Sequence, residues 1–319
     1  MTVRPAPRIS DLPAARPETD DWATYGGLPV VIEGVAEKWA AVGKWTADHL
    51  EQRAGEQQVT AFVTDESLQG TVLQQINKKV TTSFGEVVRH IFGVHRSDPA
   101  LSYYLRVEPG SAVYEELASD FEIPDTGRAF NPAWTGIWMG QRGNSTPFHN
   151  DQWHGLLFQI SGHKRYTMVH PFDAPRLQQD WPPEARYDLS HAEVLAEDAP
   201  VLRELEQVYQ GVLSPGEVLY VPPFWMHQVV TLDDGNISMP IRFDTSQSPD
   251  LSLFQFSQRS SLRNLTNQPV SDVPTIVEFL RRNRAHFDDL EQEFAEAIVR
   301  VRNLEISAAD LLEAVERGA

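Results

Sequence analysis

Short apolar runs separated by turn residues dominate the middle of the chain. Gly, Pro and Asp-Gly pairs punctuate the sequence from about residue 101 to 245, and runs of this length between such residues are typical of strands. Because no helical pattern alternates with the runs, they favour a barrel or sandwich and thus a mainly β fold. The predicted strands cover residues 28–32, 102–107, 135–139, 155–160, 165–169, 217–221, 227–232 and 237–243.

Helical patterns flank this region on both sides. Thr46 is a candidate N-cap for a helix through about Arg53, and Ser83 precedes an amphipathic pattern over residues 84–91. Ser307 is placed to start a last helix, and an apolar stripe at helical spacing precedes it, at Phe287, Leu290, Phe294, Ile298 and Val301. We therefore expect a flexible arm over residues 1–21, a main domain over 22–268 and C-terminal helices over 269–319.

Composition narrows the classes of function. The 319 residues include no Cys, which excludes disulfides, thiolate metal ligands and cysteine nucleophiles. The sequence contains no apolar stretch long enough for a membrane span and no apolar core of a secretory signal near its start, so a cytoplasmic protein that engages no membrane is expected. The net charge of −18 repels phosphate backbones. We expect no nucleic acid ligand and a partner that is basic or neutral; the alternative explanation of the charge is solubility alone.

His149 and Asp151 carry the first indication of chemistry. Residues two apart in a strand point to the same face, so this imidazole and this carboxylate would converge on one point. Many His-x-Asp pairs are surface accidents, but a second histidine, His227, follows the predicted strand 217–221, and a barrel could bring the two segments together. Two imidazoles and one carboxylate on one face of an ion form the facial triad of non-haem Fe(II) oxygenases, which leaves the opposite positions open.

Longer runs of sequence surround these three residues. They are GNSTPFHNDQWHGLLFQISGHKRYTMVHP, SPGEVLYVPPFWMHQVVTLDDGNIS and, near the N-terminus, LPVVIEGVAEKWAAVGKWTADHL. Together they closely resemble the JmjC/cupin-like hydroxylases, which include asparaginyl hydroxylases and bacterial peptide hydroxylases. The resemblance implies a double-stranded β-helix (the jelly-roll of the cupin/JmjC type) with flanking helices and a C-terminal helical appendage. It also implies iron, Fe(II), on His149, Asp151 and His227.

The same resemblance implies residues for 2-oxoglutarate, the co-substrate of the family. Lys164, fifteen residues after His149, matches the lysine that pairs with the far carboxylate of 2-oxoglutarate. A partly buried carboxylate needs such a cation. Thr146 matches a hydroxyl that bonds the same carboxylate, and Tyr104 matches a phenol that completes the clamp, although a packed core aromatic is the alternative for Tyr104. Trp138 is expected to line the pocket.

Two positions depart from the asparaginyl-hydroxylase pattern. Arg242, fifteen residues after His227, and Gly155, six residues after the first ligand, stand where that pattern carries asparagines. If the apolar residues of strand 237–243 pack against flanking elements, Arg242 on the other face points into the barrel. We then expect it to help define the substrate or co-substrate pocket. The alternative is an ion pair with Asp244 or a nearby Glu.

The activity that the resemblance implies is that of an Fe(II)- and 2-oxoglutarate-dependent dioxygenase. It would hydroxylate a side chain of a protein or peptide and release succinate and CO2. A small-molecule hydroxylase and an N-methyl-lysine demethylase are alternatives on the same scaffold. A non-oxygenase cupin fits less well, since such proteins usually carry His-x-His at the first metal strand and Lys164 would be unexplained. The C-terminal stripe, and the place of the dimer helices in the resembling hydroxylases, predict a homodimer through residues 273–317. The alternative is that the stripe packs back on its own barrel.

Overall fold

The computed structural model describes residues 3–9, 28–65, 78–95, 101–126, 135–151, 153–170, 173–177, 194–222, 225–243 and 306–317, together with residues 273, 274, 277, 295 and 299. Within these residues, thirteen strands make up two sheets. They are β1 (Arg8–Ile9), β2 (Val30–Ile32), β3 (Gln58–Asp65), β4 (Lys79–Ser83), β5 (Leu101–Val107), β6 (Ile137–Gly140), β7 (Ser145–His149), β8 (His154–Ser161), β9 (Lys164–Val169), β10 (Val208–Leu213), β11 (Val218–Val221), β12 (Met226–Thr231) and β13 (Asn236–Phe243).

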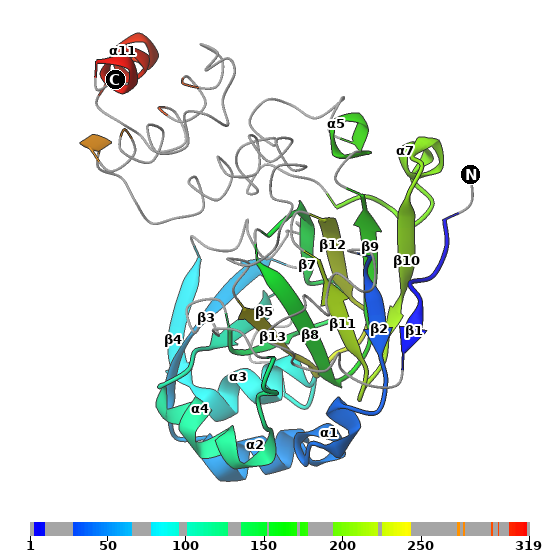
Figure 1. The fold of residues 1–319 in the computed structure, drawn as a ribbon. Helices are drawn as coiled ribbons and strands as arrows, with labels where there is room; N and C mark the ends of the chain where they lie inside the picture. Colours follow the sequence, from blue (N-terminus) through cyan, green and yellow to red (C-terminus); the bar gives the residue numbers. More distant parts are fainter. Residues whose placement is uncertain are drawn as a thin grey trace.

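The strands form two sheets that face each other (Figure 1). The larger has the order β1-β2-β11-β8-β13-β6-β5-β3-β4, and the smaller has the order β10-β9-β12-β7. Successive strands from β7 to β13 mostly pass from one sheet to the other, and their pairing is antiparallel. This arrangement is the jelly-roll of the cupin type, so the predicted fold class is confirmed.

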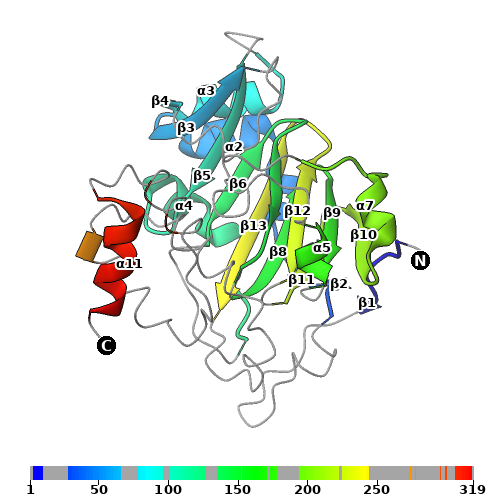
Figure 2. The ribbon, with the colours of Figure 1, turned by 90° about the horizontal axis from the view of Figure 1, so that it is seen from above.

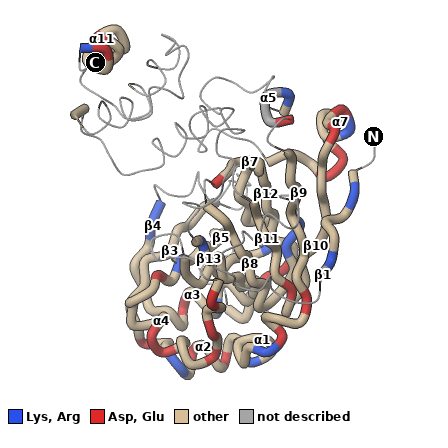
Figure 3. The backbone as a smooth tube through the Cα atoms, viewed as in Figure 1, with Lys and Arg blue, Asp and Glu red and all other residues tan. Residues whose placement is uncertain are grey.

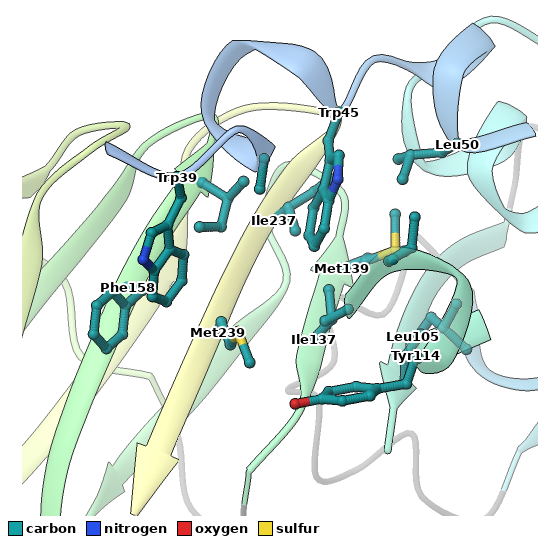
Figure 4. Close-up of a cluster of buried hydrophobic side chains, with 14 of the residues drawn as sticks. Trp39, Trp45, Leu50, Leu105, Tyr114, Ile137, Met139, Phe158, Ile237 and Met239 are labelled. Carbon is teal, nitrogen blue, oxygen red and sulfur yellow. The ribbon is translucent and has the colours of Figure 1, made fainter. Parts of the chain in front are cut away.

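Helices cover the outer face of the larger sheet. They are η2 (Ala36–Lys38), α1 (Ala41–Lys44), α2 (Ala47–Ala54), α3 (Phe84–Ile91), α4 (Ala112–Leu117) and η5 (Ala118–Asp120). Trp39 stacks on Phe158 of β8 at 4.4 Å between ring centroids, and Ile237 and Met239 of β13 lie in the same cluster (Figure 4). Because these side chains face the helices, the alternate residues of β13 must face the smaller sheet.

Side-chain caps mark the helix starts that the sequence predicts. Thr46 accepts a hydrogen bond from the backbone N–H of His49 at 3.3 Å, and Ser83 accepts one from Glu86 at 3.3 Å. The last helix, α11 (Ala308–Glu316), begins after Ser307, which accepts from the N–H of Asp310 at 3.1 Å. The helix predicted around residues 286–303, with its apolar stripe, lies outside the described residues apart from 295 and 299.

The described part of the predicted N-terminal arm, residues 3–9, is docked on the barrel. Residues 3–9 pack along the barrel: β1 pairs with β2, and Arg4 exchanges backbone hydrogen bonds with Val208 and Gln210 of β10. Ala6 is buried against the same side. An edge strand with unpaired backbone groups is stabilised by such pairing, and this explains why a polar, proline-rich segment is held there. The rest of the predicted arm, residues 10–21, lies outside the described residues.

Two short helices lie at one end of the smaller sheet, on the side away from β3 and β4 (Figure 1). They are α5 (Ala174–Leu177) and α7 (Pro200–Glu204), which lie beside β9 and β10 (Figure 2). Strands β1, β3, β4, β7 and β10 are not among those predicted. The described helices include none long and apolar enough to cross a membrane.

Charge is distributed unevenly between the surface layers and the strands. Acidic and basic residues lie over the helices and the loops, whereas β8, β11 and β12 contain neither (Figure 3). Two cations on the strands are buried nonetheless, Lys164 of β9 and Arg242 of β13. Since burying a charge is unfavourable unless it is paired, the partners of these two side chains matter for the site.

Candidate metal and co-substrate site

His149, Asp151 and His227 lie together at one end of the barrel. His149 ends β7 and is the direct cross-strand neighbour of His227 in β12, with ring centroids 4.1 Å apart. Asp151 follows two residues after His149, and one ligand atom from each of the three residues lies within 4.8 Å of the others. Within the described residues this is the group found able to hold a metal ion, and it is the triad that the sequence predicts.

Both imidazoles present the same nitrogen to the centre. Nδ1 of His149 lies 2.9 Å from the carbonyl oxygen of Pro147, and Nδ1 of His227 lies 2.9 Å from that of Trp225. Since a carbonyl oxygen can only accept, Nδ1 carries the proton and Nε2 keeps its lone pair for an ion. Burial, together with the neighbouring His149, lowers the pKa of His227 to about 3, so the ring is a neutral ligand near pH 7.

An irregularity in β7 brings Thr146 to the same face as the histidines. His227 is opposite His149, but Val229 is opposite Thr146, so three steps on β7 match two on β12. This is a β-bulge, which turns a residue at odd spacing onto the inward face. The expected neighbourhood of Thr146 and the triad therefore depends on the bulge, which simple strand alternation does not predict.

Lys164 is the buried cation of the smaller sheet. It begins β9 opposite Thr231, and its Nζ donates to Oγ of Ser238 across the barrel at 2.6 Å. No carboxylate in the described part of the chain pairs with it, and burial lowers its pKa to about 7. A buried ammonium group without a carboxylate partner is unfavourable, so binding of an anion beside it would be stabilising. Ser238 was not singled out as a site residue from the sequence, although its strand parity with Arg242 was visible there.

Tyr104 and Trp138 line the inward face of the larger sheet beside this lysine. Trp138 is the neighbour of Ser238 on β13, and Tyr104 lies on β5 with its ring 6.4 Å from that of Trp138. Tyr104 is buried, and burial raises the pKa of its phenol, so it is a neutral hydrogen-bond donor. Tyr103, with the opposite parity, packs against His90 in the helical layer instead.

Arg242 points into the barrel, as strand parity indicates, but its partner is not one that the sequence suggests. Its Nε and Nη2 lie 2.8 and 2.7 Å from Oδ2 of Asp151, so it pairs with a candidate metal ligand. The alternative partner Asp244 lies outside the described residues. Although burial alone would raise the pKa of Asp151, the charge of Arg242, followed by those of the histidines, lowers it well below its usual range.

His154 shows how strand parity separates ligands from packing residues. It begins β8, where Nδ1 lies 2.8 Å from the hydroxyl of Tyr220 and the ring stacks on Phe243 at 5.1 Å. Phe243 and Tyr220 belong to the cluster beneath the helices. His154 therefore faces away from the triad, as its spacing from His149 predicts.

Comparison with known proteins places these residues in a family. The model of the cupin-like domain matches residues 17–248, most of the chain. This chain belongs to the cupin-like (JmjC) family. It is 27% identical over 247 residues to Jumonji C domain-containing protein 5 of Drosophila melanogaster, covering 72% of this chain and 59% of that protein.

Two further relatives differ in the activity that their names state. The chain is 32% identical over 216 residues to lysine-specific demethylase JMJ30 of Arabidopsis thaliana, covering 65% of this chain and 48% of that protein. It is 27% identical over 221 residues to tRNA wybutosine-synthesizing protein 5 of Gallus gallus, with 65% and 68% covered. The chain spans about half the length of the demethylase it matches, so the relatives identify the cupin-like domain and not a substrate.

The donor set fits the iron of a cupin-like oxygenase. Two imidazole nitrogens and one carboxylate are a combination that suits Fe(II) and leaves positions for other ligands. The Nδ1 contacts to carbonyl oxygens fix the ring orientations before any ion binds.

Proposed function

We propose that this protein is an Fe(II)- and 2-oxoglutarate-dependent dioxygenase that hydroxylates a side chain of a protein or peptide. The observation that carries the proposal is Lys164, a buried ammonium without a carboxylate partner among the described residues, in the same barrel as the His149, Asp151 and His227 triad. A dicarboxylate could place one carboxylate at the metal held by the triad and pair the other with Lys164. Thr146, Tyr104 and Trp138 are proposed to surround it.

The chain's own residues would bind, orient and shield. The triad holds Fe(II), Lys164 anchors the far carboxylate of 2-oxoglutarate, and the phenol of Tyr104 donates to that carboxylate. When bound, iron and 2-oxoglutarate would activate O2, so that one oxygen atom enters the substrate C–H bond as hydroxyl and the other enters succinate, with release of CO2. The apolar walls of the barrel exclude water, which strengthens each electrostatic contact in the site.

A protein or peptide that is basic or neutral is the proposed substrate. The net charge of −18 favours such a partner over an acidic one. A cytoplasmic location and the absence of nucleic acid and membrane partners remain predictions from the sequence. The names of two relatives, lysine-specific demethylases of Arabidopsis thaliana and Xenopus tropicalis, favour N-methyl-lysine demethylation as the second candidate.

Mass spectrometry separates these candidates. The protein would be incubated with Fe(II), 2-oxoglutarate and peptide pools with and without N-methyl-lysine, while succinate is measured. A gain of one oxygen atom on a peptide is expected for hydroxylation, whereas loss of a methyl group with release of formaldehyde would identify a demethylase. Oxidation of a small molecule alone would indicate the small-molecule alternative. If succinate never exceeds the level of an iron-free control, the dioxygenase proposal is wrong.

Binding of 2-oxoglutarate should weaken as pH rises through about 7. Lys164 has a pKa of about 7 in the free protein, and only its protonated form attracts the carboxylate. Affinity should therefore be steady below pH 7 and fall by roughly tenfold per pH unit above it, until the pKa of the bound lysine is reached. Calorimetry on the Mn²⁺-loaded protein between pH 6 and 8.5 measures this. Lys164→Arg stays charged throughout and should bind without this pH dependence; a flat profile for the parent protein contradicts the prediction.

The chain is also predicted to form a homodimer through residues 273–317. Light scattering should give twice the 36.0 kDa chain mass. Leu290→Asp with Phe294→Asp, or a chain ending near residue 268, should give a monomer, because a charged residue in an apolar stripe removes the surface that a partner would bury. A monomeric parent protein at micromolar concentration would rule out the dimer, and a dimer that survives both changes would place the interface elsewhere.

A further inference from the structure

Arg242 makes two close contacts with Asp151 beside the proposed metal site. Both of its donors, Nε and Nη2, address a single oxygen, Oδ2, at 2.8 and 2.7 Å. The same Oδ2 lies 3.9 Å from Nε2 of His227. We propose that Arg242 is a positioning residue that holds the carboxylate of Asp151 toward the two histidines for metal binding, and that Gly155 is small so that the guanidinium fits. The inference rests on the proposed metal site and concerns the ion alone, before any co-substrate binds.

Asp151 needs such a contact because of its place in the chain. It lies two residues beyond the end of β7, outside the ladder that fixes His149 and His227. Its side chain is 22% exposed, whereas that of Arg242 is 9% exposed and is held in the middle of the larger sheet. Arg242, on a strand inside the sheet, thus restrains Asp151, which lies on a segment outside the sheet.

Gly155 and Arg242 are direct neighbours across β8 and β13. A Cβ at position 155 would lie 3.1 Å from Nη1 of Arg242 and 3.3 Å from Cβ of Val221, which is tighter than ordinary contact. The guanidinium therefore occupies the space that a side chain at position 155 would fill. The two departures from the asparaginyl-hydroxylase pattern are thus connected: the large side chain of Arg242 fits because its cross-strand neighbour is a glycine.

Charge and orientation make opposite predictions for the removal of Arg242. A cation beside a divalent ion repels it, so loss of the charge alone would tighten metal binding. Loss of the orienting contact would weaken binding, since partners that hold metal ligands commonly contribute 10- to 100-fold in affinity. The sign of the change therefore separates a positioning role from a purely electrostatic one.

The experiment is a calorimetric titration of the full chain with Mn²⁺ alone. Arg242→Met retains the length and removes both donors, and it should raise the Kd for Mn²⁺ by roughly 10- to 100-fold. Arg165→Met is the matched control, because Arg165 of β9 pairs with Glu197, whose side chain is 62% exposed, and should leave the Kd unchanged. An equal or tighter Kd for Arg242→Met overturns the inference. A parent protein that binds no Mn²⁺ overturns the metal site itself, and the inference with it.

Gly155→Val provides a second route that keeps every charge. The valine side chain would displace the guanidinium from Asp151, so the Kd for Mn²⁺ should rise as expected for Arg242→Met. This variant keeps the test available if Arg242→Met folds poorly. In the double variant the guanidinium is already absent, so the two changes should not add. A Gly155→Val protein with the parent Kd, or a double variant in which the two effects add fully, would overturn the pairing.

Discussion

Replacing Lys164 with methionine is expected to stabilise the protein while abolishing tight binding of 2-oxoglutarate. The far carboxylate of the co-substrate would lose its buried partner, which costs roughly 3–5 kcal/mol, or a rise in Kd of about 100-fold or more. The fold, by contrast, would no longer bury an ammonium group whose pKa is lowered to about 7. At pH 7 this should raise the free energy of unfolding by about 3 kcal/mol, after loss of the hydrogen bond to Ser238.

The stability gain should depend on pH in a defined direction. The pKa of Lys164 is lower in the folded protein than in the unfolded chain, so burial of its charge destabilises the fold fully below about pH 7 and ceases to do so above the usual lysine pKa. Urea unfolding at pH 6.5 and pH 10 should therefore show a large gain for Lys164→Met at the lower pH and little at the higher. Lys79→Met, at an exposed position of β4, is the control for both measurements. Unchanged affinity for 2-oxoglutarate would show that another cation anchors it.

His149→Ala and His227→Ala are each expected to remove metal binding and turnover together. Each change deletes one of three ligands, and the loss should exceed the roughly 100-fold that supporting residues contribute. The parent protein should gain about 2.7 kcal/mol of stability at a metal concentration 100 times the Kd, whereas the variants should gain none at that concentration. Thermal unfolding with and without Mn²⁺ measures this without any substrate.

A histidine outside the triad provides the control for these two variants. His163 lies beside Asp233 at the surface, with a side chain 48% exposed, and His163→Ala should keep the metal-dependent stabilisation. Iron content and succinate release are then compared across the same set. If both triad variants retain iron and turnover, the assignment of the ligands is wrong.

Local patterns in the sequence were sufficient for much of the architecture. Turn residues and short apolar runs predicted strands that correspond to β2, β5, β6, β8, β9, β11, β12 and β13, because the two-residue period and its interruptions are properties of neighbouring residues. Thr46, Ser83 and Ser307 predicted helix starts for the same reason, since a cap is a contact over three residues. Parity alone separated His149 and Asp151 from His154, and Tyr104 from Tyr103.

The tertiary structure decided what depends on residues far apart in the chain. The bulge that turns Thr146 inward, the approach of Ser238 to Lys164 and the docking of residues 3–9 each need a partner strand whose register the sequence does not state. Arg242 is the clearest case. Its strand face could be predicted, but its partner could not, because Asp151 lies 91 residues away and Gly155 makes room from a third segment. The two-residue alternation of a strand determines which face a side chain lies on. The register and packing of the sheets determine which residues it contacts.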